Sequence, residues 1–397
     1  MKRLFALICL VVCISCFARL QGAAPQKTIC LNMIVKNESK VITRCFDSVL
    51  PLIDTWVIVD TGSTDGTQEV IRDYMANKGI PGHLYERPWK NFGHNRNEAL
   101  QLAKGMADYV LIIDADETLS FEPTFQLPDL TYDFYYIMTK FGGTIYARVQ
   151  LINIARFDWK WVGVLHEFLD CPYAYRVTTL EGVYNVVFTD GDRSQDPLKY
   201  QKDVQILEQG LIDEPNNVRY VFYLAQSYRD AGMLEKALEN YQRRISLGGW
   251  DQEVFWSKLE VALLQERLGM PAEVYEESYW EAFRFRPTRV EPLYHLMNAL
   301  RHEGDFQRAY EIGLTAITIP LSKDILFVQK WIYDYGLLLE QSICAYWIGN
   351  YEETRDLSLR ILALPDLPAN IIECVQSNLA FANFKILEPK HRKKTKP

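Results

Sequence analysis

The stretch VIVDTGSTDGTQEVI (57–71) combines a strand, a tight turn and the start of a helix. A run of Val and Ile ends at Asp60, and the two glycines of the turn allow the backbone to reverse sharply. Asp65 and Gln68 have the spacing of a capping box at a helix start. Backbone donors and a helix N-terminus are therefore expected at the end of a buried strand, where an anion or a ribose can bind. An ordinary strand–turn–helix connection without a ligand is the alternative.

Two further apolar runs lie on either side of this stretch, ICLNMIV (29–35) and YVLIID (109–114). Helical segments separate the runs, which is the pattern of βαβ units and predicts an α/β fold with a mostly parallel sheet. Aromatic-rich, alternating strands follow over 132–187. Ligands bind such sheets at the carboxyl ends of the strands. The polar residues expected at those ends are Asn37, Glu38, Asp60 and Asp114.

Two acidic pairs differ in their surroundings. Asp114 and Asp116 leave a buried strand with one residue between them, and holding both carboxylates there is costly unless a cation compensates. A divalent cation with oxygen ligands meets that need. The pair in the segment 190–192 lies in a polar turn, where we expect water to solvate both side chains. His166 and Glu167 follow an aromatic strand and are candidates for a third metal ligand and a general base.

From about Leu198 the sequence is helical and carries a loose repeat. Four glycines each follow an apolar helical stretch: Gly232, Gly269, Gly304 and Gly349. The residues five and nine positions after each glycine are mostly small. They are Ala237 and Tyr241, Val274 and Ser278, Ala309 and Gly313, and Thr354 and Ser358. Tetratricopeptide (TPR) repeats use such positions to bring paired helices together, so the pattern predicts an all-α TPR-like solenoid. An ordinary helical bundle is the alternative.

Charge and the leader limit the classes of partner. Outside the leader and the basic C-terminal segment, 51 acidic residues face 35 basic ones, which excludes a general nucleic-acid binder because phosphates would be repelled. Residues 1–24 place Lys2 and Arg3 before an apolar run, as in a signal peptide or signal anchor. Export or membrane association is therefore expected. The five later cysteines look like buried free thiols, which keeps a cytoplasmic location open.

Five motifs occur in the order found in one enzyme family: MIVKNES (33–39), VDTGSTDGT (59–67), RNEAL (96–100), DADE (114–117) and HE (166–167). Over about residues 28–190 the chain resembles the inverting family 2 glycosyltransferases of the GT-A fold. The later segments FYLAQSYRDAG and GGWDQEVF resemble the helical-repeat tail of a bacterial subgroup. Four segments are predicted: a leader 1–24, a GT-A domain 25–195, a TPR-like domain 196–387 and a basic tail 388–397.

The resemblance implies transfer of a sugar from a nucleotide-sugar donor, a UDP-sugar above all, to a glycan, lipid or peptide acceptor. It implies Mn²⁺ or Mg²⁺ as the cofactor. Donor contacts are implied for Asn37, Glu38, Asp60, Arg96, Asp114 and Arg193. Metal ligands are implied at Asp114, Asp116 and His166, and the base that activates the acceptor at Glu167 or Glu117.

A protein-binding function is the alternative. In that case the transferase domain is inactive or only binds the nucleotide sugar, and the helical repeats dock a protein partner or form a dimer. The paired carboxylates of DADE and the HE pair favour catalysis, because such groups are costly to keep without a role.

Overall fold

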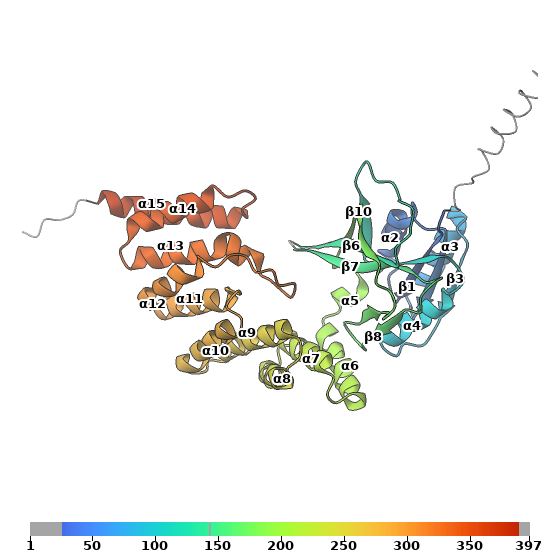
Figure 1. Ribbon diagram of the computed structural model, residues 1–397, viewed down its shortest axis with the longest axis horizontal. Helices are drawn as coiled ribbons and strands as arrows, with labels where there is room; N and C mark the ends of the chain where they lie inside the picture. Colours follow the sequence, from blue (N-terminus) through green and yellow to red (C-terminus); the bar gives the residue numbers. More distant parts are fainter. Residues whose placement is uncertain (1–25, 143, 389–397) are drawn as a thin grey trace, which may run out of the picture. The chain divides into compact units, whose positions relative to one another are not determined.

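The computed structural model describes residues 26–142 and 144–388. The chain divides into two compact units between Lys202 and Asp203, inside helix α6 (Lys199–Asp213) (Figure 1). The predicted leader 1–24 lies outside the described residues, as does the basic tail beyond residue 388. Among the helices that the structure describes, none is long and apolar enough to cross a membrane.

The first unit is built on an eight-stranded sheet with the strand order β3-β2-β1-β4-β7-β6-β10-β5. Four neighbouring strands are parallel: β1 (Ile29–Val35), β2 (Thr55–Asp60), β3 (Gly82–Glu86) and β4 (Tyr109–Ile112). Three helices connect them in turn: α2 (Ile42–Val49), α3 (Thr67–Lys78) and α4 (Phe92–Leu102). The predicted α/β fold with a mostly parallel sheet is confirmed.

The other half of the sheet is mixed. Its strands are β5 (Glu117–Phe121), β6 (Phe134–Phe141), β7 (Thr144–Asn153) and β10 (Val177–Val187). Strand β7 is antiparallel to β4 and β6, β10 is parallel to β6, and β5 is antiparallel to β10. A short hairpin of β8 (Lys160–Val162) and β9 (Phe168–Asp170) forms a separate sheet, and the short helix α5 (Asp192–Gln195) follows β10.

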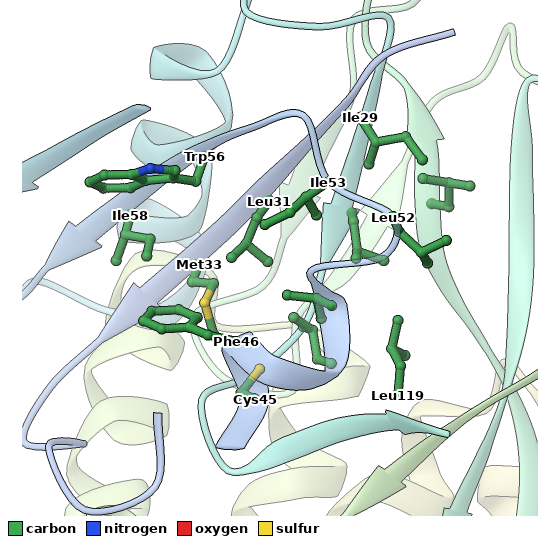
Figure 2. Packing of buried hydrophobic residues seen from close by; sticks show 14 of the residues in the cluster. Ile29, Leu31, Met33, Cys45, Phe46, Leu52, Ile53, Trp56, Ile58 and Leu119 are labelled. Atoms are coloured by element: carbon green, nitrogen blue, oxygen red, sulfur yellow. The ribbon is translucent and has the colours of Figure 1, made fainter. Parts of the chain in front are cut away.

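Alternation along the central strand explains the core. Leu31 and Met33 on β1 point to one face, where they pack with Phe46 of α2 and Ile58 of β2 (Figure 2). Cys30 points to the opposite face, into a second buried cluster. Because successive side chains of a strand alternate, a strand buried on both faces is mostly apolar, and the one polar residue of β1, Asn32, donates to the buried carbonyl groups of Val57 and Ala99. Burial on both faces holds these strands in place, and the polar residues of the candidate site follow their carboxyl ends.

The second unit is a series of helical hairpins. Its helices after α6 are α7 (Val218–Asp230), α8 (Leu234–Leu247), α9 (Asp251–Arg267), α10 (Ala272–Phe285), α11 (Glu291–Glu303), α12 (Phe306–Ala316), the π-helix η1 (Ile332–Gly336), α13 (Leu337–Trp347), α14 (Tyr351–Leu362) and α15 (Ala369–Leu387). From α7 to α15 the successive α-helices pack on one another, as neighbouring repeats of a solenoid do. The predicted TPR-like region is confirmed.

The predicted repeat register is wrong in the second copy. Val274 is 40% exposed, whereas Tyr275 and Tyr279 are among the residues of α10 that are buried. The turn between Gly269 and α10 contains Pro271 and is one residue longer than expected, which rotates the buried face by one position. The predicted positions in the other three copies are buried, for example Ala237, Tyr241, Ala309, Thr354 and Ser358, which are all 0% exposed.

The five cysteines that the structure describes are all free, but they are not all buried. Cys30, Cys45 and Cys344 are buried, Cys171 is partly exposed and Cys374 is exposed. The prediction of buried thiols is therefore wrong for the last two.

Candidate active site

Asp60, at the end of β2, organises the loop that follows it. The side chain is 1% exposed. Its Oδ1 accepts hydrogen bonds from the backbone N–H groups of Gly62 and Ser63, both at 2.9 Å, and from Gln68 Nε2 at 3.1 Å. Its Oδ2 is buried and has no hydrogen-bond partner among the described residues. One oxygen of this carboxylate is thus fully used, and the other is available to a ligand.

The predicted capping box is wrong. Gln68 turns back to Asp60 instead of capping the helix, and the N-cap of α3 is Gly66, which has no side chain to offer. Asp65 accepts from the N–H groups of Thr67 at 3.1 Å and Ser39 at 3.0 Å. Although desolvation opposes it, hydrogen bonds from the side chains of Thr67 and Ser39 and from these N–H groups lower the pKa of Asp65 to about 2. Asp65 therefore ties the loop after β2 to the loop after β1.

Asn37 and Glu38 belong to that second loop. Asn37 has a φ of 57°, its N–H donates to Ser63 Oγ at 2.8 Å, and its Oδ1 accepts from the N–H of Thr64 at 2.9 Å. The carboxylate of Glu38 has a buried Oε2 without a partner among the described residues. Burial and the charge of Asp116 raise the pKa of Glu38 to about 8. The two loops together present acceptor oxygens at the carboxyl ends of β1 and β2.

Charged side chains of alternating sign follow, from α4, from the segments after β4 and before β9, and from the middle of β7. Arg96, on α4, donates from Nε to Glu167 Oε1 at 2.6 Å and from Nη2 to Asp114 Oδ1 at 2.7 Å. Arg148, on β7, lies 3.6 Å from Asp114 Oδ2 and pairs with Glu117. Burial raises the pKa of Asp114, but the two guanidinium groups outweigh it and lower the pKa below its usual value. Five charged side chains therefore form one continuous network, in the order Glu167, Arg96, Asp114, Arg148 and Glu117.

The second acidic pair, Asp190 and Asp192, is exposed as predicted, and it also borders the same site. Arg44 holds Asp190 with two hydrogen bonds of 2.8 Å. A Cβ at Gly191 would lie 2.8 Å from Asp116 Oδ2, so this backbone packs directly on Asp116. Burial and the charges of Asp114 and Asp190 raise the pKa of Asp116. In the described part of the chain, Asp116 forms no salt bridge.

Close backbone packing brings the His166–Glu167 segment to the sheet. A Cβ at Gly93 of α4 would lie 2.0 Å from the carbonyl oxygen of Gly163, so only glycine fits there. Asn97 exchanges two hydrogen bonds of 2.8 Å with the backbone of Trp161. These contacts hold α4 against β8 and place Arg96 beside Glu167.

Two predicted residues remain, His166 and Arg193, of which Arg193 is partly buried. His166 is exposed and has a φ of 52°. The guanidinium group of Arg193 lies 4.5 Å from the ring centroid of Phe92, the first residue of α4. Within residues 26–142 and 144–388, no group of three His, Cys, Asp or Glu side chains is arranged to hold a metal ion. The metal site stays a prediction.

Two arginines were missed from the sequence. Arg148 stands in the otherwise mostly apolar strand YARVQLI of β7, and a lone cation in such a strand could have been noticed. Arg44 lies on α2, and no local pattern links it to Asp190. Both pair with carboxylates that are distant in the sequence.

Known proteins similar to this chain fall into two groups. A family model described as glycosyl transferase family 2 matches residues 30–127. An uncharacterized glycosyltransferase of Rickettsia felis is 33% identical over 240 residues, which are 56% of this chain and 77% of that protein. The SPbeta prophage-derived glycosyltransferase SunS of Bacillus subtilis is 24% identical over 234 residues, 55% of this chain and 53% of SunS.

The second group carries helical repeats. A TPR repeat-containing protein of Synechococcus elongatus is 27% identical over 268 residues, 63% of this chain and 64% of that protein. The chain therefore spans less than two thirds of the length of this relative and of SunS. A solved TPR protein of Thermus thermophilus matches 46% of this chain with 15% identity and a TM-score of 0.33. At that distance the likeness says nothing about function.

Proposed function

Since the chain belongs to family 2 of the glycosyltransferases, we propose that its first unit transfers a sugar from a nucleotide-sugar donor, with inversion of the anomeric carbon. A UDP-sugar is the proposed donor class, and a glycan, lipid or peptide is the acceptor. Support comes above all from one observation. Carboxylates converge at the carboxyl ends of β1, β2 and β4, where Asp116 has no salt bridge and one buried oxygen each of Asp60 and Glu38 lacks a partner among the described residues.

The nucleoside is proposed to bind over the loops that follow β1 and β2. Buried polar atoms are almost always hydrogen-bonded in native proteins. The unpartnered Oδ2 of Asp60 therefore suits a ribose hydroxyl or a base N–H. Asn37 positions the loop through its bonds to Ser63 and Thr64 and extends the same surface. Arg193, beside Phe92 at the start of α4, is proposed to contact the diphosphate.

We propose Mn²⁺ or Mg²⁺ as the cofactor, bound at Asp116. Carboxylate oxygens are the preferred ligands of these cations, and Asp116 is partly buried near Asp114 and Asp190 without a cationic side chain of its own in the described residues. We assign Asp116 as the main ligand, with Asp114 and His166 as the further ligands. When bound, the cation stabilises the negative charge that develops on the departing nucleoside diphosphate.

Glu167 and Glu117 are proposed for different tasks. The Glu167 side chain is 9% exposed and its Oε1 accepts from Arg96 Nε at 2.6 Å, which orients the carboxylate to take the proton of the acceptor. Glu117 is 3% exposed, and its Oε2 accepts from the backbone N–H of Asp114 at 3.2 Å. Glu117 is therefore a positioning residue that fixes Asp114 and Arg148, and Glu167 is the stronger candidate for the base.

Asp116→Asn in the full chain tests the proposal. A panel of nucleotide sugars is incubated with the protein and Mn²⁺ or Mg²⁺, and released nucleoside diphosphate is measured. We expect metal-dependent release by the natural chain and a loss of roughly 100-fold or more in the variant, because the charge stabilisation of the leaving group is removed. Quenching of Trp fluorescence by UDP with Mn²⁺ reports binding separately.

Asp158→Asn is the matched control, because the Asp158 side chain is 89% exposed and pairs with Lys104 at the surface. It should turn over donor like the natural chain. Unchanged turnover in Asp116→Asn would sink the assignment of Asp116. Quenching by UDP without any turnover would instead favour a binding domain without catalysis.

A further inference from the structure

Helix α15 is the last described helix of the second unit, and it packs on α14 and α13 (Figure 1). Its inner face is the stripe that contains Val375 and Ala382, both 0% exposed. The inner face is therefore fully engaged in the solenoid.

The C-terminal half of the opposite face of α15 is exposed and apolar. Phe381, Phe384 and Leu387 are 59%, 64% and 81% exposed. A contiguous exposed apolar patch of this kind marks a contact site.

Large and small side chains are segregated along this face. Cys374, Ser377, Phe381 and Phe384 follow one another at spacings of three, four and three residues, which is the seam of a helix pair. The small members lie in the N-terminal half and the large ones in the C-terminal half. If two such helices pair in antiparallel fashion, Phe381 meets the partner's Ser377 and Phe384 meets the partner's Cys374. Each large side chain then fills the space left by a small one.

We propose that a second copy of this chain covers α15, with the two α15 helices antiparallel. Charge favours this direction. Antiparallel helices bring the last turn of each α15, which carries Lys385, towards the exposed acidic residues near the start of the other, Asp366 and Glu373.

The area involved predicts a weak dimer. The three exposed side chains contribute about 400 Å² of apolar surface per copy, if a large apolar side chain has roughly 200 Å² in total. The paired helices are about 28 Å long at 1.5 Å per residue. The buried area is therefore near the low end of the range for specific protein–protein interfaces. We expect the fraction of dimer to depend on protein concentration.

Sedimentation velocity of the full chain tests the proposal at concentrations between about 1 and 200 µM. We expect the mass to rise from monomer to dimer, and the double variant Phe381→Glu with Phe384→Glu to stay monomeric throughout. Ile325→Glu is the matched control, because Ile325 is 82% exposed outside α15, and it should dimerise like the natural chain. A natural chain that stays monomeric at the highest concentration, or a double variant that still dimerises, overturns the proposal.

A single cysteine variant tests the direction of the helices. Phe384→Cys should form a disulfide between the introduced thiol and the exposed native Cys374 of the second copy under mild oxidation by oxidised glutathione. Mass spectrometry of chymotryptic peptides should identify that bond, because cleavage after Leu379 or Phe381 places the two cysteines on different peptides. The two positions are about 15 Å apart along one helix, so the bond cannot form within one copy. A cross-link between the two introduced thiols, or no cross-link in a sample that sediments as a dimer, would contradict the antiparallel arrangement.

Discussion

Arg96 shows how one side chain assembles the candidate site. It joins Asp114, at the end of β4, to Glu167, which precedes β9, and its guanidinium group lies 5.1 Å from the ring centroid of Trp161. The side chain is only 11% exposed. Three favourable contacts offset the desolvation of this cation, and the two carboxylates gain a counter-charge from it.

Arg96→Ala should destabilise the first unit and abolish turnover. Removing one member of a buried ion pair leaves unpaired charges, at a cost of about 3–5 kcal/mol in the free energy of unfolding. Urea unfolding followed by circular dichroism measures the loss. Arg96→Lys keeps the charge but not the paired donors of the guanidinium group. Its free energy of unfolding should lie between those of Arg96→Ala and the natural chain. Equal stability of Arg96→Ala and the natural chain would show that the network is not coupled.

Gly191→Ala tests the contact between the second acidic segment and Asp116. The backbone φ is ordinary at Gly191, so the cost arises from the new Cβ, which would lie 2.8 Å from Asp116 Oδ2 and 3.0 Å from its Cβ. We expect a turnover loss of about tenfold or more, with a stability loss of about 1–3 kcal/mol. Gly105→Ala is the control: its φ of 79° makes the variant strained, but nothing lies within 4 Å. Its stability should fall while turnover stays unchanged.

Helix α11 carries a buried histidine, His295, through which we expect folding to depend on pH. His295 stacks on Tyr279 of α10, with the ring centroids 6.3 Å apart, and its Nε2 is buried without a partner among the described residues. Desolvation lowers its pKa from 6.5 to about 4, although Glu291 acts in the opposite direction. The imidazole is therefore neutral in the folded unit at about pH 5, where the unfolded chain binds a proton.

Acidification should consequently weaken the second unit. The stability linked to His295 is fully present above pH 6.5 and is lost as the pH falls towards 4, by at most about 3 kcal/mol. Carboxylates titrate in the same range, so the comparison is with His295→Gln, whose unfolding free energy should depend less on pH between about 7 and 4. Parallel pH curves for the two proteins would contradict a depressed pKa of His295.

The molecule as a whole consists of two units with their own cores. Units of this size usually unfold as separate cooperative blocks. Each variant named above should then change the unfolding of only the unit in which it lies.

Two thermal transitions are therefore expected in calorimetry of the full chain. Arg96→Ala should lower one of them and His295→Gln should change the pH dependence of the other. UDP with Mn²⁺ should raise only the transition that Arg96→Ala lowers, because a ligand stabilises the unit that binds it. One cooperative transition that responds to all three changes would mean that the units unfold together.

Local features of this molecule could be predicted from neighbouring residues alone. Apolar runs ending in Asp60 and Asp114 predicted the parallel strands and the edge at which their polar residues lie. Glycines and the spacing of small residues predicted the helical repeats, because periodicity and backbone conformation are properties of adjacent residues.

The contacts between distant groups could not be predicted in this way. Folding pairs Arg148 with Glu117 and Arg44 with Asp190, and it packs Gly191 on Asp116. Such contacts join segments far apart in the chain, and they depend on strand order and helix packing. A local sequence pattern does not predict these contacts, because the free energy that favours them comes from burial and charge pairing in the folded molecule.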